Sequence, residues 1–143
     1  MKKFTSILLT LLLIVFVAGY AKAELIGLWL FDEGTGTVAK DSSRGGNNGK
    51  INNATWADGQ YGKALEFNGT NANVEIQHAP VLSVERFTLM AWMNVPGFTG
   101  NWQTIATQDT AGPNRNYGLF INNGSGLIHY SFTSGKAWQS FNA

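Results

Sequence analysis

The sequence predicts an all-β, antiparallel fold, and three observations support this expectation. The chain has 143 residues, with 44% hydrophobic residues, 13% charged residues and no Cys. Short runs rich in Val, Ile, Phe, Trp and Thr alternate with clusters of Gly, Asn, Asp and Ser. Beyond residue 24, no stretch of useful length repeats apolar residues at helical spacing. The length fits one domain, and the regular turn clusters indicate a sandwich or barrel.

The first 23 residues have the pattern of a cleavable export signal. Met1–Lys3 supplies the positive charge, 7–17 is almost wholly apolar, and Ala21 and Ala23 place small residues at the −3 and −1 positions. The alternative, a membrane anchor, is disfavoured because a spanning helix needs about 20 apolar residues. We therefore expect cleavage after Ala23, a mature domain over 24–143, and a secreted protein, extracellular or periplasmic, with no membrane attachment after cleavage.

The charge distribution argues against a nucleic-acid partner. Lys2, Lys3 and Lys22 account for three of the ten Lys and Arg residues, whereas all nine acidic residues follow Ala23. The mature chain is therefore slightly acidic. A protein that neutralises phosphates needs a basic surface, so we expect no binding of nucleic acid.

The expected strands follow one another along the mature chain, each bounded by turn residues. Asn48-Gly49, Asn68-Gly69 and Asn123-Gly124 tolerate the positive φ angles of tight turns, and we expect hairpins there. In particular, Asn68-Gly69 should join the third run to the fourth. The runs cover residues 25–31, 48–55, 61–67, 72–77, 86–95, 103–108, 116–122, 126–133 and 136–141.

The run 86–95 has the clearest alternation in the chain. One face carries only apolar residues: Phe87, Leu89, Ala91, Met93 and Val95. This alternation predicts a strand whose apolar face lines the core between two sheets. The second face still carries Met90 and Trp92, so either a loop covers it partly or Trp92 faces a ligand on a concave surface.

Five motifs occur in an order that is typical of one family. They are Gly27-Leu28-Trp29-Leu30-Phe31-Asp32-Glu33-Gly34-Thr35-Gly36, Asp41-Ser42-Ser43 with Asn47-Asn48-Gly49, Trp56, Gly62-Lys63-Ala64-Leu65-Glu66-Phe67-Asn68-Gly69 and Phe87-Thr88-Leu89-Met90-Ala91-Trp92. Over residues 25–132 the chain resembles the bacterial secreted form of laminin-G-like domains, in the concanavalin A-like lectin/glucanase superfamily. The resemblance implies an antiparallel two-sheet jelly-roll sandwich.

The chain departs from that family at its C-terminal end. Domains of the family continue with a Trp-His-x-Val-Ala strand and a Tyr-x-Asp-Gly hairpin, whereas here Trp138-Gln139-Ser140-Phe141 is followed by Asn142 and Ala143. The resemblance therefore implies an incomplete sandwich, comparable with the first two-thirds of such a domain. Two explanations stand: a fragment of a larger exported protein, or a small variant completed by a partner chain.

A catalytic site is not expected. Hydrolases of this superfamily use Glu-x-Asp-x-x-Glu on one strand, and this pattern is absent. Asp32 and Glu33 are adjacent, so on a strand they would point to opposite faces. Glu66 and Glu75 would lie on the two arms of the predicted hairpin at 68–69, where solvated charges are the expected role. A fragment of a glycan-active hydrolase is thus the least favoured function.

If the chain binds a metal ion, calcium is the expected one. Zinc is disfavoured because the chain lacks Cys and has only His78 and His129, far apart in sequence. Relatives implied by the resemblance often hold calcium through hard oxygen ligands. Two loops offer them: one with Asp41 and Asn48, with Asp32 across from it, and one with Asp109. The alternative is that these side chains bond their own backbone in turns.

A glycan is the expected ligand. Sugar-binding surfaces stack an aromatic ring on a pyranose and surround it with polar side chains. Trp102 lies in a Gly/Asn-rich loop, and Asp109, Asn114 and Asn116 occupy the next loop. Alternatively, Trp102 anchors its loop to the core. The sequence thus predicts a non-catalytic recognition or adhesion module for a glycan or extracellular protein, with a purely structural or protein-interaction module as the alternative.

Overall fold

The structure, a computed structural model, describes residues 23–97, 100–109, 115–122, 124–134 and 137–142. It confirms the all-β, antiparallel class: these residues form nine strands and one 3-10 turn, η1 (Pro80–Leu82), with no α-helix among them. No helix in the described ranges is both long and apolar enough to span a membrane. The strands are β1 (Val38–Ala39), β2 (Gly49–Asn52), β3 (Thr55–Asp58), β4 (Lys63–Glu66), β5 (Asn73–Ile76), β6 (Gln103–Asp109), β7 (Arg115–Ile121), β8 (Ile128–Ser134) and β9 (Ala137–Asn142).

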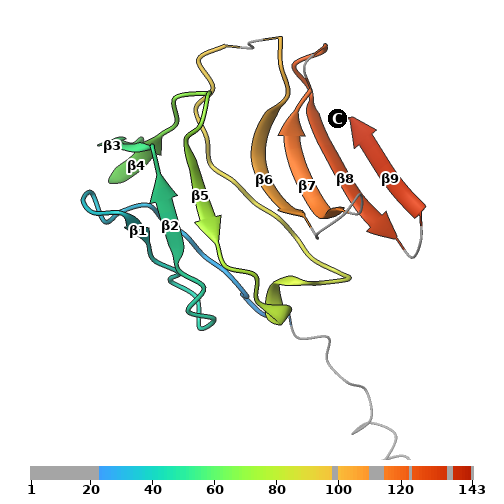
Figure 1. Cartoon of the computed structure of the whole chain (residues 1–143), viewed down its shortest axis with the longest axis horizontal. Coiled ribbons are helices and arrows are strands. Elements are labelled where there is room, and N and C mark those ends of the chain that lie inside the picture. Colours follow the sequence, from blue (N-terminus) through green and yellow to red (C-terminus); the bar gives the residue numbers. More distant parts are fainter. Residues whose placement is uncertain (1–22, 98–99, 110–114, 123, 135–136, 143) are drawn as a thin grey trace, which may run out of the picture.

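The strands pair into three antiparallel sheets. Their orders are β1-β2-β5, β3-β4 and β6-β7-β8-β9. The two small sheets come from the N-terminal half of the described chain, and the four-stranded sheet comes from the C-terminal half (Figure 1). The predicted first strand, 25–31, is reduced to a single bridge between Trp29 and Asp41.

The N-terminal pairing differs from the predicted hairpins. Asn68 and Gly69 do form a turn, with Gly69 at a φ of 69°. This turn joins β4 to β5, but β4 pairs with β3 whereas β5 pairs with β2. The prediction of a hairpin at 68–69 is therefore wrong, and Glu66 and Glu75 lie in separate sheets. The cause is a non-local pairing, in which β5 joins the edge of β2 across the intervening β3-β4 hairpin.

Gly49 has a different role from the one expected of Asn48-Gly49. It lies inside β2, paired with Ile76, rather than in a turn. A Cβ atom at this position would collide with the Val74 side chain. Glycine is thus required by the close approach of β2 and β5, not by a positive φ angle.

The four-stranded sheet follows the predictions closely. It is a simple meander in which each strand pairs with the next, as hairpins in sequence order allow. The expected hairpin between β7 and β8 is confirmed, because the two strands pair and Asn122 N–H donates to the carbonyl of Leu127 at 2.9 Å, while Asn123 itself lies outside the described residues. Since paired residues share a face, the alternation along β7 and β8 defines the two faces of the sheet.

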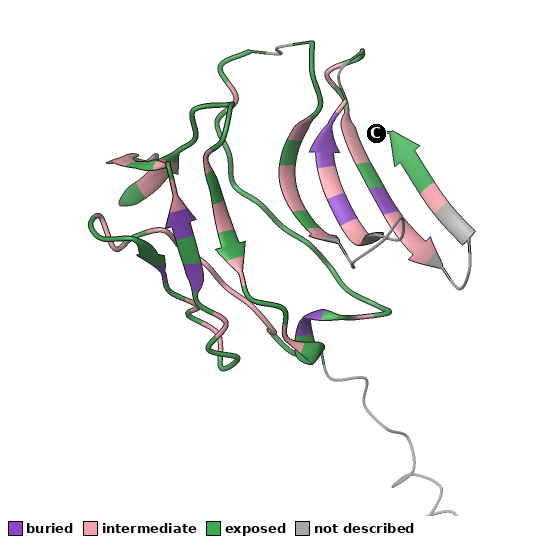
Figure 2. Cartoon of the chain, in the orientation of Figure 1, coloured by how far each residue is buried: buried purple, intermediate pink, exposed green. Residues whose placement is uncertain are grey.

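The predicted core strand at 86–95 is not formed. This segment is described throughout, yet it belongs to no strand, and its backbone makes no hydrogen bond to another described backbone group. It runs as an extended connection between β5 and β6 (Figure 1). Its side chains are mostly exposed, including Met90 at 86% and Trp92 at 85% (Figure 2). The alternation is real, but a strand also needs a neighbour with which to pair.

Few side chains are fully buried, and they lie in separate places. Figure 2 shows the buried positions on β1 and β2, in η1 and on β7 and β8. The buried hydrophobic residues are Ala39, Ile51, Leu82, Phe120 and Ile121. Ile121 and Phe120 are adjacent in β7, so they face opposite sides of the four-stranded sheet. That sheet is therefore covered, at least in part, on both faces.

Candidate functional site

One face of the four-stranded sheet carries an aromatic and polar cluster. In the register, Phe120 of β7 lies opposite His129 of β8, and His129 lies opposite Asn142 of β9. The three side chains therefore form a row across three strands. Trp102 immediately precedes β6, whose residue Thr104 pairs with Phe120. The start of β6 thus brings the Trp102 ring to one end of this row.

The ring of Trp102 rests on this row. Its centroid lies 4.8 Å from that of His129, with an interplanar angle of 72°, and 6.3 Å from that of Phe120. Both are edge-to-face arrangements, which aromatic pairs favour. Phe120 beneath is buried, whereas Trp102 remains 48% exposed. The indole is therefore held by its neighbours and still presents surface to solvent.

Hydrogen-bonding groups adjoin the indole. Nδ1 of His129 lies 2.7 Å from Oδ1 of Asn142, and Nδ2 of Asn122 donates to the same oxygen at 3.4 Å. Because an amide oxygen accepts but cannot donate, this contact assigns the proton to Nδ1 of His129. In the neutral ring, Nε2 is then left as an acceptor. We call Trp102, Phe120, His129, Asn122 and Asn142 the Trp102 cluster.

Sequence reasoning named Trp102 but missed its neighbours. The sequence pattern gives His129 no role beyond being one of two widely separated histidines, and it gives Asn142 none. Their proximity to Trp102 depends on the register of β7, β8 and β9. The available clue was that Phe120 and His129 stand at equal distance from the turn at 124–125.

The other predicted glycan ligands lie elsewhere. Asp109 is the last residue of β6 and Trp102 precedes its first, so their backbones are separated by about 20 Å, the length of seven extended residues. Asn116 Nδ2 donates to Oε1 of Gln108 at 2.7 Å, near that same far end. Asn114 lies outside the described residues. The structure does not bring Trp102 together with Asp109 or Asn116.

Asp41 is the centre of a dense set of hydrogen bonds. Its Oδ1 accepts the N–H groups of Leu28 at 3.0 Å and Ser43 at 2.8 Å. Its Oδ2 accepts the N–H of Asn47 at 2.8 Å and the side-chain Nδ2 of Asn47 at 3.3 Å. Both carboxylate oxygens therefore have two donors each. We call this group the Asp41 clasp.

These donors change the acidity of Asp41. Burial alone would raise the pKa of its carboxyl group, but hydrogen bonds from Ser43, Leu28 and Asn47 outweigh burial and lower the pKa from 3.8 to about 2. The anion is thus the form that the clasp stabilises. The carboxylate acts here as a local organiser of the backbone between residues 28 and 47.

Two further bonds extend the clasp. Asn48 Oδ1 accepts the N–H of Asp41 at 2.9 Å, and Nε1 of Trp29 donates to the Asn47 carbonyl at 2.9 Å. Of the predicted metal ligands, the structure therefore brings Asp41 and Asn48 together. Their oxygens, however, face N–H donors, as side chains in turns commonly do.

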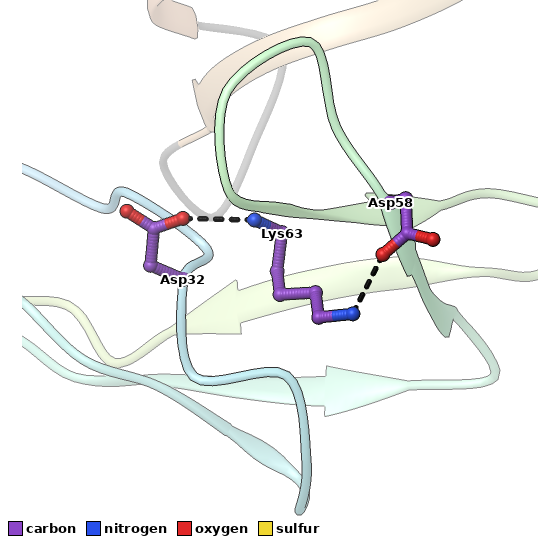
Figure 3. A network of polar contacts seen from close by, with 3 residues as sticks. All are labelled: Asp32, Asp58 and Lys63. Atoms are coloured by element: carbon purple, nitrogen blue, oxygen red, sulfur yellow. Dashed lines mark hydrogen bonds and ion pairs between the residues drawn. The ribbon is translucent and has the colours of Figure 1, made fainter.

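Asp32, the third predicted ligand, belongs to a separate network. Its Oδ1 accepts the backbone N–H of Lys63 at 3.0 Å, and Nζ of Lys63 forms an ion pair with Asp58 at 2.6 Å (Figure 3). The hydrogen bond and charge of Lys63 lower the pKa of Asp58. The bond from Asp32 to the start of β4 ties the segment at 32 to the β3-β4 hairpin.

Calcium binding stays a prediction. Asp109, the fourth predicted ligand, ends β6 in the four-stranded sheet, whereas the other three precede β2 in the sequence. Within the described ranges, no group of three or more His, Cys, Asp and Glu side chains is positioned to hold a metal ion. Amide and backbone oxygens can also bind calcium, so a binding experiment decides whether either predicted loop holds the ion.

Comparisons of the chain with models of protein families, with curated proteins and with solved structures find no match.

Proposed function

We propose that this protein is a non-catalytic extracellular recognition module that binds glycans through the Trp102 cluster. The proposal includes the laminin-G-like, concanavalin A-like relationship suggested by the sequence motifs. It also includes export, because the pattern of residues 1–23 is that of a cleaved signal. The observation that carries the proposal is the half-exposed indole of Trp102, supported by His129 and flanked by amide side chains.

The arrangement suits a sugar for two physical reasons. A pyranose has an apolar face of C–H groups, and a ring fixed in position contacts it without losing much side-chain freedom. Trp102 is fixed by His129, whose ring lies 4.8 Å away between centroids. The hydroxyl groups of a sugar need donors and acceptors, and Asn122, Asn142 and His129 Nε2 supply both.

Catalysis is not part of the proposal. Hydrolysis that retains configuration uses two carboxyl groups about 5–5.5 Å apart. The pair considered from the sequence, Glu66 and Glu75, is divided between β4 and β5, which do not pair with each other. The Trp102 cluster itself contains no carboxylate. Its chemistry is that of binding.

The test is glycan binding by the mature chain, by two variants of Trp102 and by one control variant of Trp92. A panel of immobilised glycans identifies a ligand, and titration calorimetry then measures its affinity. We expect Trp102→Ala to weaken binding at least tenfold, whereas Trp102→Phe keeps part of the affinity. The matched control is Trp92→Ala, since Trp92 is another exposed indole, at 85%, far from the cluster in sequence. Equal affinity of Trp102→Ala and the wild type would refute the proposed site.

A protein-interaction module is the second candidate, and one observation favours it. The extended segment 86–95 exposes Met90 and Trp92, and its backbone makes no hydrogen bond to another described backbone group. Exposed apolar residues of this size commonly mark contact surfaces. The Trp92→Ala and Trp102→Ala variants separate the two candidate functions: loss of ligand binding with Trp92→Ala and not with Trp102→Ala would favour the protein-interaction function.

A further inference from the structure

The two Asn-Gly pairs at 48–49 and 68–69 lie in very different surroundings. In such a pair the side-chain amide of Asn is open to attack by the backbone nitrogen that follows, because glycine has no side chain to hinder the approach or restrict the backbone. Gly49 is buried within β2, which is hydrogen-bonded to β1 on one side and to β5 on the other. Asn68 and Gly69 instead lie in the exposed turn that joins β4 to β5 (Figure 1). The same dipeptide is thus fixed in one place and accessible in the other.

The turn holds the side-chain amide of Asn68 in one orientation. Its Oδ1 accepts the backbone N–H groups of Thr70 at 2.9 Å, Asn71 at 3.0 Å and Ala72 at 3.1 Å. Its Nδ2 donates to Oδ1 of Asn71 at 2.8 Å. Three N–H donors that converge on one carbonyl oxygen resemble the arrangement with which enzymes stabilise an oxyanion. Such hydrogen bonds become stronger as negative charge develops on the oxygen.

The backbone nitrogen of Gly69 is positioned in the chain to attack this amide. Among the described residues, its N–H has no hydrogen-bond acceptor. Gly69 has a φ angle of 69°, and, apart from Gly69 and its two neighbours in sequence, no described atom lies within 4 Å of the position that a Cβ would occupy. No interaction within the described structure therefore has to break before this nitrogen loses its proton.

We propose that Asn68 is a site of self-catalysed modification, at which the nitrogen of Gly69 attacks Cγ of Asn68 and the side-chain amide is lost. The nitrogen gives its proton to hydroxide and forms a bond to Cγ. The negative charge that then appears on Oδ1 is stabilised by the N–H groups of residues 70–72. The Cγ–Nδ2 bond breaks, and Nδ2 leaves as ammonia after it takes a proton from water. The product is a succinimide ring.

Water opens this ring at one of its two carbonyl groups. Attack at Cγ breaks the bond from Cγ to the Gly69 nitrogen and leaves aspartate at position 68. Attack at the backbone carbonyl carbon of residue 68 breaks the other bond to that nitrogen and leaves isoaspartate, in which the main chain runs through the former side chain. Overall, water replaces ammonia, and nothing is oxidised or reduced. Either product adds a negative charge to the turn, and a carboxylate accepts N–H groups more strongly than an amide does.

Asn48 is the internal comparison. Its Oδ1 accepts the N–H of Asp41 at 2.9 Å, which is its one donor among the described groups. The nitrogen of Gly49 belongs to the central strand of its sheet, so it cannot turn toward the Asn48 side chain without disturbing the pairing with β1 or β5. We therefore expect folding to suppress the reaction at Asn48 and not at Asn68.

The test follows both Asn-Gly pairs in the mature chain. The protein is incubated in mildly alkaline buffer, either folded or unfolded by guanidinium chloride, and peptide mapping by mass spectrometry measures the loss of each amide. We expect Asn68 to react at least about tenfold faster than Asn48 in the folded chain, and the two to react at similar rates in the unfolded chain. Equal rates at the two sites in the folded chain, or a faster reaction at Asn48, would overturn the proposal.

A substitution tests the route of the reaction. Gly69→Ala places a methyl group beside the attacking nitrogen and should slow the reaction at Asn68 at least about tenfold. Gly36→Ala is the matched control, because Gly36 also has a positive φ angle, 82°, and open space at its Cβ position, yet it follows Thr35 instead of an Asn. It should leave the rate at Asn68 unchanged. Circular dichroism confirms that each variant is folded, and the rates in guanidinium chloride compare them independently of folding.

The products identify the intermediate. Ring opening yields isoaspartate as well as aspartate, and enzymatic methylation of the isoaspartyl carboxylate detects the former in the peptide that contains position 68. Direct hydrolysis of the amide by water would yield aspartate alone. Formation of isoaspartate at position 68 of the folded wild type, with its loss in Gly69→Ala, is the expected result. Aspartate without isoaspartate, or an unchanged rate in Gly69→Ala, would overturn the proposal.

Discussion

Trp102 and His129 form an edge-to-face pair, with ring centroids 4.8 Å apart and planes at 72°. One strand, β7, lies between them in the order of the sheet, since Trp102 precedes β6 and His129 belongs to β8. The indole therefore leans over β7, above the buried ring of Phe120. The position of the Trp102 indole therefore depends on its contact with His129 as well as on its own loop.

The first prediction concerns His129→Ala. Removing the imidazole takes away one ring contact of Trp102, which should cost about 0.5–1.5 kcal/mol of stability in addition to lost buried area. It also frees Trp102 to adopt other rotamers, so glycan affinity should fall although His129→Ala leaves the indole present. Chemical denaturation and calorimetric titration measure the two effects. His129→Phe keeps a ring at this position and should retain more stability; identical stability of the wild type and His129→Ala would contradict the contact.

The second prediction concerns Gly62, which has a φ angle of 68° and lies beside Asp32. A Cβ atom there would collide with the Asp32 carboxylate that accepts the N–H of Lys63. Gly62→Ala should therefore lower the free energy of unfolding by about 1–3 kcal/mol, through backbone strain and a displaced hydrogen bond.

Gly36 supplies the matched control for this substitution. Its φ angle of 82° is similarly unfavourable for alanine, but, apart from Gly36 and its two neighbours in sequence, no described atom lies within 4 Å of the position that a Cβ would occupy. Gly36→Ala should introduce backbone strain without a collision, so we expect it to lose less stability than Gly62→Ala. Thermal melting of the two variants compares them directly, and a larger loss at Gly36 would show that the Asp32 contact is unimportant.

The C-terminal sheet was predictable because its pairing is local. Runs at 103–108, 116–122, 126–133 and 136–141 correspond closely to β6, β7, β8 and β9, and each strand pairs with the next in sequence. The Asn123-Gly124 turn favours such a hairpin. In contrast, β2 pairs with β5 across an inserted hairpin, and no short-range pattern indicates that choice. The segment 86–95 shows the same limit: alternation defines two faces of a strand but supplies no partner.

The candidate site was only half predictable for a related reason. An indole in a loop rich in Gly and Asn indicates an exposed Trp102, and it is half exposed. Its companions depend on register, since a shift of one residue would turn His129 to the other face. The Asp41 loop was recognised as rich in oxygen ligands, but composition does not distinguish a carboxylate that faces a cation from one that faces N–H groups.

The third prediction tests the Asp41 clasp directly. Asp41→Asn keeps the size of the side chain but replaces one acceptor oxygen with an NH₂ group, which would face the donors of Asn47 or of Leu28 and Ser43. Because these N–H donors would lose an acceptor, Asp41→Asn should lower the free energy of unfolding by about 1–3 kcal/mol. Asp58→Asn is the control, because Asp58 is exposed and makes a surface ion pair that contributes little. Urea denaturation should separate the two variants clearly; equal losses would argue against the clasp.

The fourth prediction follows from the low pKa of Asp41. Because its pKa falls from 3.8 to about 2 on folding, the unfolded chain binds this proton more readily. The stabilisation is complete above pH 3.8 and is lost as the pH falls toward 2. We expect it to amount to about 1–2 kcal/mol after allowance for solvent screening. Melting of the wild type and Asp41→Asn between pH 5 and pH 2 should therefore converge at the acid end, and parallel curves would contradict this assignment.

The fifth prediction concerns calcium and the loop at 41–48. A cation bound by Asp41 would have to displace N–H donors that lie 2.8–3.0 Å from its oxygens, and those backbone groups would lose their acceptors. We therefore expect no calcium ion at Asp41, so any rise of the melting temperature that millimolar calcium causes should persist in Asp41→Asn. A ligand that binds the folded state must raise that temperature, so the measurement is decisive. If calcium raised it, repeating the titration with Asp41→Asn would locate the site: a lost shift would return the loop to its predicted metal role, and a retained one would direct attention to Asp109 and its neighbours.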